Sequence, residues 1–205
     1  AARSCGGSAG TKSSLPFWDE RMRIACLSPL PPAASGIADY LAELLPGLAE
    51  QFEIELFVED GRPPGRFAGR FPLQSVKAFP RLYEQGRYDL ALYQLGNNRD
   101  YHAETYHLLL RYPGVVVLHE TLLHHLIRGI TLDRGDPAGY VEALRYCCGR
   151  SGEAAARRLL ATGMPLDPWS YPLFERAVDA SLGVLVHNEW ARRRVLASRP
   201  LARVA

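Results

Sequence analysis

Short segments rich in branched apolar residues alternate along this chain with longer stretches whose apolar residues recur at helical spacing. The short segments are RIACL, EIELFV, residues 88–95, VVVL and LGVLVH. Near-continuous apolar strands must be covered on both faces, and strands that are separated by helices become parallel neighbours in one sheet. The sequence therefore predicts an α/β fold with a Rossmann-like, doubly wound parallel sheet.

One amphipathic stretch and one helical insert complete this organisation. In residues 36–52 the apolar side chains are spaced for one helix face, and Pro46 is expected to kink or shorten that helix. Residues 121–180 have a mostly helical pattern between the last two predicted strands, which indicates an insert. Residues 1–21 are small and polar and are interpreted as a flexible tail, so the predicted domain covers residues 22–205.

Composition argues against several classes of protein. The chain has 24 Lys and Arg against 22 Asp and Glu, and this formal charge of +2 does not favour nucleic acid as a partner. No apolar run reaches the roughly 20 residues of a membrane span. The four cysteines have no C-x-x-C spacing, and we expect a reducing, cytoplasmic setting. His119, His124 and His125 lack the spacing of metal ligands, so no metal site is expected.

Polar residues follow four of the predicted strands. Ligands bind outside the carboxyl ends of the strands in sheets of this type, so these residues are the candidates for a site. Ser35 and Gly36 stand at a helix start after the proline-rich loop SPLPPAA, where free backbone amides and a missing Cβ would admit a phosphate or a sugar hydroxyl. The other three strands are followed by GNNRDYH, HETLLHH and HNEWARR.

Each of these candidates also has a purely structural interpretation. Ser35 could instead cap the helix, and for this residue taken alone the capping role is favoured over ligand binding. Asn97 and Asn98 follow Gly96 in a sequence typical of a turn, with ligand contact an equal alternative. His119 ends the most apolar strand, and its position beside three other polar strand ends favours a functional role. There is no G-x-G-x-x-G or Walker sequence, which argues against a dinucleotide or a P-loop site.

Three segments, taken in order, resemble the N-terminal domain of GT-B-fold glycosyltransferases of family 4, the retaining "group 1" enzymes. They are MRIACLSPLPPAASGIADYLAELLPGL, YQLGNNRDYHAETYHLLLRYPGVVVLHETLLHHL and DASLGVLVHNEWARRRV. The resemblance implies an enzyme that moves a sugar from a nucleotide-sugar donor, UDP- or GDP-linked, to a carbohydrate or lipid-linked acceptor. It implies no metal and no other cofactor.

The resemblance also implies roles for particular residues. His119 matches the histidine that contacts the transferred sugar, and it is therefore the catalytic candidate. Donor or acceptor binding is implied for Ser35, Gly36, Asn97, Asn98, His102, Glu120 and Asn188. The family usually has Gly-Gly where this chain has Ser35-Gly36, so the backbone at this point is expected to approach a ligand differently.

The donor side of the cleft is expected to lie outside this chain. The family binds the donor with an E-x7-E pair in a C-terminal domain, and no two glutamates here have that spacing. We therefore expect the N-terminal half of a longer enzyme, inactive alone, with its own C-terminal domain as a partner. The alternative is a non-catalytic, Rossmann-like binding or regulatory module. Membrane-surface binding through residues 152–164 is a weaker possibility than packing of that helix on the sheet.

Overall fold

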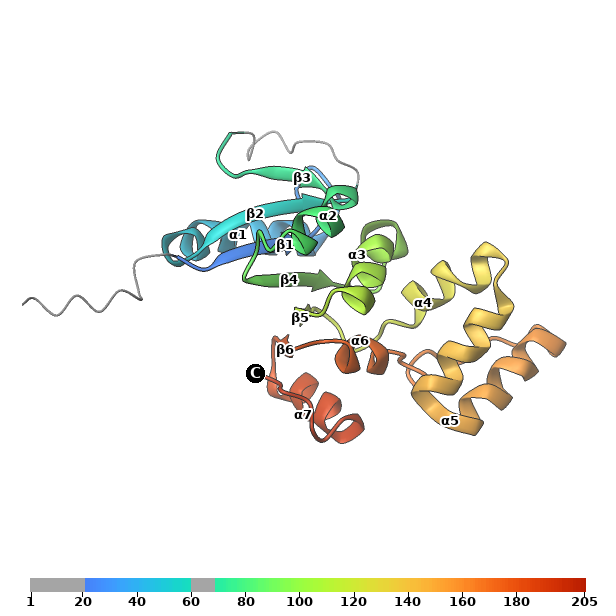
Figure 1. Cartoon of the computed structure of the whole chain (residues 1–205). Helices are drawn as coiled ribbons and strands as arrows, with labels where there is room; N and C mark the ends of the chain where they lie inside the picture. The colour runs from blue at the N-terminus through green and yellow to red at the C-terminus, as the bar shows by residue number, and fades with distance from the viewer. Residues whose placement is uncertain (1–20, 60–68) are drawn as a thin grey trace, which may run out of the picture.

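Six parallel strands form one sheet in a computed structural model that describes residues 21–59 and 69–205 (Figure 1). The strand order is β3-β2-β1-β4-β5-β6, which is the order of a Rossmann-like fold. The predicted α/β class and parallel sheet are confirmed. Most of the predicted tail, residues 1–20, lies outside the described residues. The strands are β1 (Arg23–Leu27), β2 (Glu53–Val58), β3 (Leu73–Ser75), β4 (Leu90–Leu95), β5 (Val115–Leu118) and β6 (Gly183–Val186).

Helices cover the two faces of this sheet unequally. The α1 helix packs Leu41 and Leu45 against one face, over Cys26 and Leu56 of β1 and β2. The opposite face carries the larger core, to which α2, α3, α6 and α7 contribute. The helices are α1 (Gly36–Gln51), η2 (Val76–Ala78), α2 (Phe79–Glu84), α3 (Arg99–Arg111), α4 (His124–Ile130), η3 (Leu132–Arg134), α5 (Pro137–Thr162), α6 (Glu175–Asp179) and α7 (Glu189–Ser198).

The α1 helix continues through the proline that was expected to disturb it. Pro46 lies inside the helix on its exposed side, while Leu41 and Leu45 are fully buried. Packing of an apolar face stabilises a helix in a protein more than local propensity does. The prediction that the helix would shorten at this proline was therefore wrong.

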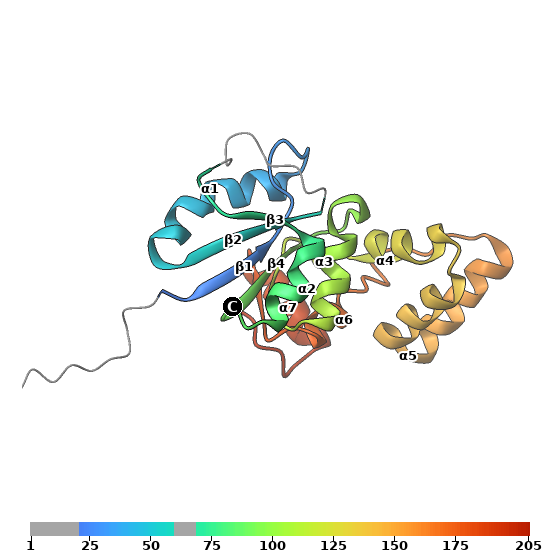
Figure 2. The same cartoon turned by 45° about the horizontal axis from the view of Figure 1, so that its top comes forward.

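The insert between β5 and β6 consists of α4, η3, α5 and α6. Within α5 the backbone leaves the helical region at Gly149, where φ is 63° and ψ is −149°, so α5 is two helices joined by a sharp turn. Figures 1 and 2 show both arms extending away from the sheet, next to α4. Residues 152–164 therefore do not lie over a strand, although Ala155 and Ala156 are buried as part of the larger core. In the part of the chain that the structure describes, no helix is both long and apolar enough to cross a membrane.

Candidate functional site

The carboxyl ends of β1, β4, β5 and β6 lie side by side along one edge of the sheet. The register places Leu27 opposite Tyr93, Leu95 opposite Leu118, and Leu118 opposite Val186. The residues that follow these strands are therefore neighbours in space. His119 and His187 follow directly after a register pair, so the topology brings their imidazoles together.

The two imidazoles form a hydrogen-bonded pair, which we call the histidine pair. The distance from Nε2 of His187 to Nδ1 of His119 is 3.1 Å. Nε2 of His119 lies 2.7 Å from Oε1 of Gln94, which projects from β4 and is only 1% exposed. Tyr40 of α1 packs its ring edge-on against both imidazoles, with 5.0 Å between ring centroids in each case. The side chains of α1, β4, β5 and the segment after β6 thus meet at one point.

Burial keeps His119 in its neutral form at neutral pH. The pKa of His119 is lowered from 6.5 to about 4, mainly because the ring is removed from water and secondly because His187 and His102 are close. A neutral imidazole has one nitrogen that donates a hydrogen bond and one that accepts. Both nitrogens of His119 are already within hydrogen-bonding distance of protein partners.

His102 lies beneath the loop that follows β4. It is 1% exposed, and its Nε2 is close to the position that a Cβ on Gly96 would take. Burial lowers the pKa of His102 from 6.5 to about 4, partly offset by a hydrogen bond with the Gln94 backbone. Its Nδ1 has no hydrogen-bond partner among the described residues. His102 therefore supports the floor of the site and does not line its open surface.

Three of the predicted residues line one open cavity of about 490 Å³ between α3 and α4. They are Asn97, Asn98 and Glu120, and the remaining wall comes from Arg99, Asp100, His125, Gly129 and Asp133. Carboxylates, an amide, a guanidinium and an imidazole around one opening give the mixture of donors and acceptors that a hydroxyl-rich ligand requires.

The side-chain oxygens of the asparagines also have structural roles. Oδ1 of Asn97 accepts hydrogen bonds from the backbone N–H groups of His125 and Leu126, at 2.9 and 3.1 Å. Asn98 caps α3 by accepting from the backbone N–H of Asp100, and Asn188 caps α7 by accepting from that of Ala191. Both the turn interpretation and the site interpretation of these residues are therefore compatible with the structure.

Ser35 and Gly36 stand at the start of α1, where Ser35 is partly exposed and Gly36 is exposed. The side chain of Ser35 makes no capping hydrogen bond, so its capping role is not observed. A Cβ added to Gly36 would meet no atom within 4 Å. The next residue, Ile37, reaches the loop after β4, where its Cδ1 would contact a Cβ on Gly96. The start of α1 therefore lies next to the loop after β4, whose Asn97 and Asn98 line the cavity. The cavity lining includes neither Ser35 and Gly36 nor the histidine pair.

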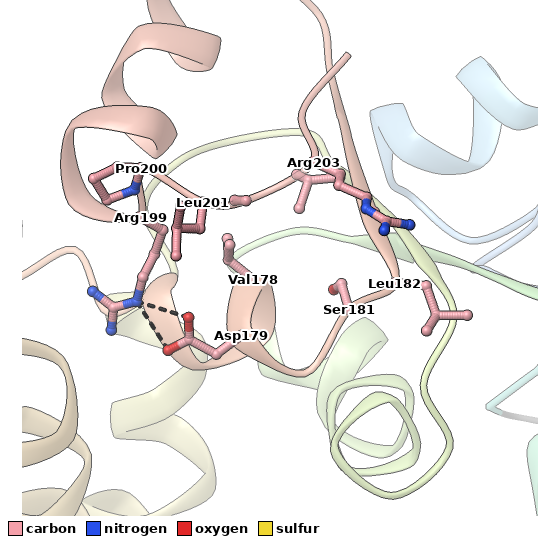
Figure 3. Close-up of a pocket in the computed structure, with 11 residues that line it drawn as sticks. Val178, Asp179, Ser181, Leu182, Arg199, Pro200, Leu201 and Arg203 are labelled. Carbon is pink, nitrogen blue, oxygen red and sulfur yellow. Dashed lines mark hydrogen bonds and ion pairs between the residues drawn. The ribbon is translucent and has the colours of Figure 1, made fainter.

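A separate cavity of about 580 Å³ lies at the opposite edge of the sheet, at the amino end of β6 (Figure 3). Its wall is formed by the end of α6, by Gly183, and by residues 199–203. Nε of Arg199 donates to both carboxylate oxygens of Asp179, at 2.8 and 2.9 Å. This cavity includes none of the predicted site residues, and two of its charged groups, Arg199 and Asp179, are paired with each other.

Three residues that contact His119 were not predicted as site residues. They are Gln94, His187 and Tyr40. Gln94 was a polar residue near the end of an otherwise apolar strand, and such a residue needs a hydrogen-bond partner inside the protein. His187 follows its strand as His119 does, which was a usable signal. Tyr40 was counted only as part of an apolar helix face. Across residues 21–59 and 69–205, no group of three or more His, Cys, Asp or Glu side chains is arranged to hold a metal ion.

No protein-family model, curated protein or solved structure matches this chain.

Proposed function

We propose that this chain is the acceptor-side, N-terminal domain of a GT-B-fold glycosyltransferase that acts in the cytoplasm. The enzyme would transfer a sugar from a UDP- or GDP-linked donor to a carbohydrate or lipid-linked acceptor. The observation that carries the proposal is that the polar residues after β4, β5 and β6 lie at the same edge of the sheet as the start of α1, which follows β1. Open parallel sheets bind their ligands at such an edge.

The chemistry of the opening suits a glycosyl acceptor. Sugar hydroxyls both donate and accept hydrogen bonds, and imidazole, carboxamide and carboxylate groups together supply both functions. The free amides at the start of α1 would favour an anionic group such as the donor diphosphate, although a helix start contributes only about 0.3–1 kcal/mol at an exposed site. The remaining donor contacts would come from the C-terminal domain, together with the groups that assist departure of the nucleotide.

Within the proposed reaction, this chain binds and orients rather than forms a covalent bond. Glu120 is exposed, but its Oε1 accepts a hydrogen bond from the backbone N–H of Asn97 at 2.9 Å. We assign no nucleophile to this chain. Holding an acceptor hydroxyl next to the anomeric carbon makes the reaction effectively unimolecular, which is a large source of rate acceleration.

The second candidate function is a non-catalytic, Rossmann-like binding or regulatory module. The observation that favours it is the use of Asn97, Asn98 and Asn188 as helix caps, because a cap explains these residues without a ligand. A following segment without a second Rossmann-like domain and an E-x7-E pair would support this candidate.

The deciding experiment measures nucleotide release and sugar transfer by the longest natural protein that contains this chain. UDP-, GDP- and ADP-sugars are supplied with carbohydrate and lipid-linked acceptors. We expect turnover with at least one donor, and a large loss in His119→Ala but not in His107→Ala, which removes an exposed histidine of α3. Absence of transfer and hydrolysis with every donor, together with an unchanged His119→Ala variant, would contradict the proposal. The 205-residue chain alone is expected to show no turnover.

A further inference from the structure

Both ring nitrogens of His119 are engaged within the protein. Nε2 faces Oε1 of Gln94 at 2.7 Å and Nδ1 faces Nε2 of His187 at 3.1 Å. A ligand can reach a nitrogen of His119 only if one of these hydrogen bonds is broken. His119, which follows β5, is thus placed to hold Gln94 and His187 rather than to contact a ligand directly.

The direction of the hydrogen bonds follows from the chemistry of the partners. Oε1 of Gln94 can only accept, so Nε2 of His119 must carry the proton. Because His119 is neutral, its Nδ1 then has no proton and must accept from Nε2–H of His187. In its neutral form His187 is left with an unprotonated Nδ1.

The three groups differ in their access to solvent. Gln94 is 1% exposed, His119 is half-buried, and His187 is exposed. Nε2 is the only ring nitrogen of His187 that forms a hydrogen bond within residues 21–59 and 69–205. Tyr40 packs edge-on against the ring of His187 at 5.0 Å and so limits how the ring can turn. A hydrogen-bond acceptor is therefore held on an exposed side chain at the carboxyl edge of the sheet.

We propose that His187, rather than His119, is the imidazole that contacts the ligand, with its Nδ1 accepting a hydrogen bond from a hydroxyl group of the acceptor carbohydrate. His119 and Gln94 are then positioning residues that fix the tautomer and the orientation of His187. The assignment of the ligand rests on the proposed function, whereas the arrangement of protons does not. A hydroxyl bound in this way would point its proton at Nδ1 of His187 and leave the lone pairs of its oxygen free.

The proton arrangement is tested without any ligand. Long-range ¹H–¹⁵N spectra of the 205-residue chain, labelled with ¹⁵N-histidine, report which nitrogen of each ring carries the proton. We expect the Nε2–H tautomer for both His119 and His187 at neutral pH. A predominant Nδ1–H tautomer at either ring would overturn the proposal.

Two substitutions of the buried amide test positioning. Gln94→Leu removes the acceptor, so both rings should change to mixtures of tautomers, whereas Gln94→Glu keeps an acceptor and should preserve the Nε2–H form. Circular dichroism establishes that each variant is folded. If the folded Gln94→Leu variant keeps both tautomers of the parent, Gln94 is not a positioning residue.

Ligand contact is tested by adding methyl α-glucoside and methyl α-mannoside to the same labelled chain. The Nδ1 resonance of His187 should move most, and the response of His119 should disappear in His187→Ala. A response of His119 that survives in His187→Ala would return the contact to His119, and no response at either ring would overturn the assignment of a ligand. Failure of sugar transfer in the longer protein would remove the proposed function but leave the measured tautomers unchanged.

Discussion

The backbone N–H of Asn97 donates a hydrogen bond to the carboxylate of Glu120 at 2.9 Å. This bond joins the loop after β4 to the loop after β5, and Oδ1 of Asn97 extends the connection to the first amides of α4. The two loops and the helix therefore form one hydrogen-bonded unit. Substitutions here will affect both the stability of the domain and the shape of the cavity, so the two effects must be measured separately.

Asn97→Ala should lower the free energy of unfolding by about 1–2 kcal/mol, because the amides of His125 and Leu126 lose their acceptor at the start of α4. Urea denaturation of the parent and the variant measures the difference. Ser35→Ala is the matched control, since Ser35 also precedes a helix but makes no side-chain capping bond. If Ser35→Ala proves as destabilising as Asn97→Ala, the side-chain capping hydrogen bonds do not explain the stability of these helix starts.

Gly96 and Gly36 should respond differently in stability to substitution by alanine. A Cβ on Gly96 would lie 2.6 Å from Cδ1 of Ile37 and 3.1 Å from Nε2 of His102, so Gly96→Ala should cost about 1–3 kcal/mol. A Cβ on Gly36 meets nothing within 4 Å, so Gly36→Ala should be neutral or stabilising by up to about 1 kcal/mol. Thermal unfolding of both variants gives the comparison.

The Gly36→Ala variant also tests donor binding without a loss of stability. In the longer protein, Gly36→Ala should weaken binding of the nucleotide-sugar donor, measured by calorimetry, if a ligand approaches the backbone at this point. Unchanged donor affinity in a stable Gly36→Ala protein would show that the start of α1 does not contact the donor.

The sheet could be predicted from the sequence because its strands are apolar on both faces and short, so few other structures would bury them. The continuation of α1 through Pro46 could not, because it depends on how Leu41 and Leu45 pack on a sheet face that local sequence does not specify. The outward direction of α5 was missed for a similar reason. The sharp turn at Gly149 did have a local signal, because a glycine inside a helical pattern can adopt the positive φ that ends a helix.

The site could be predicted in its location but not in its internal connections. The pairing of β5 with β6 places His119 and His187 beside each other. The sequence of a single strand does not determine which strand it pairs with. The roles of Asn97 and Gln94 depend on contacts with residues that are 28 and 25 positions away. Such hydrogen bonds are consequences of the assembled sheet, so residue type and position alone leave them undetermined.

Stability should fall as the pH falls through the range set by the buried histidine of α3. The pKa of His102 is lowered from 6.5 to about 4 by burial, so the unfolded chain takes up a proton that the folded chain does not. The contribution of His102 to the free energy of unfolding is on the order of 3 kcal/mol. It is fully present above about pH 6.5 and is lost as the pH falls toward 4. His119, whose pKa is also lowered to about 4, acts in the same direction but is more exposed.

His102→Gln should therefore flatten the dependence of unfolding free energy on pH between about 6.5 and 4, as measured by urea denaturation at several pH values. His107→Gln, which alters an exposed histidine of the same helix, should follow the parent. Parallel curves for the parent and His102→Gln would mean that His102 does not carry this proton linkage.

The ion pair between Arg199 and Asp179 should contribute more to stability than an exposed pair on α5. Nε of Arg199 contacts both oxygens of Asp179, and the two side chains are 26% and 31% exposed. Tyr146 donates to the same carboxylate at 3.1 Å, so Asp179→Ala leaves two donors without this partner. We expect a loss of about 1–3 kcal/mol.

The control, Glu142→Ala, removes a pair with Arg145 in which the side chains are 56% and 61% exposed, and should cost below about 1 kcal/mol. Equal losses for the two variants in urea denaturation would show that the hydrogen bonds to Asp179 at the end of α6 contribute nothing beyond an ordinary surface charge pair.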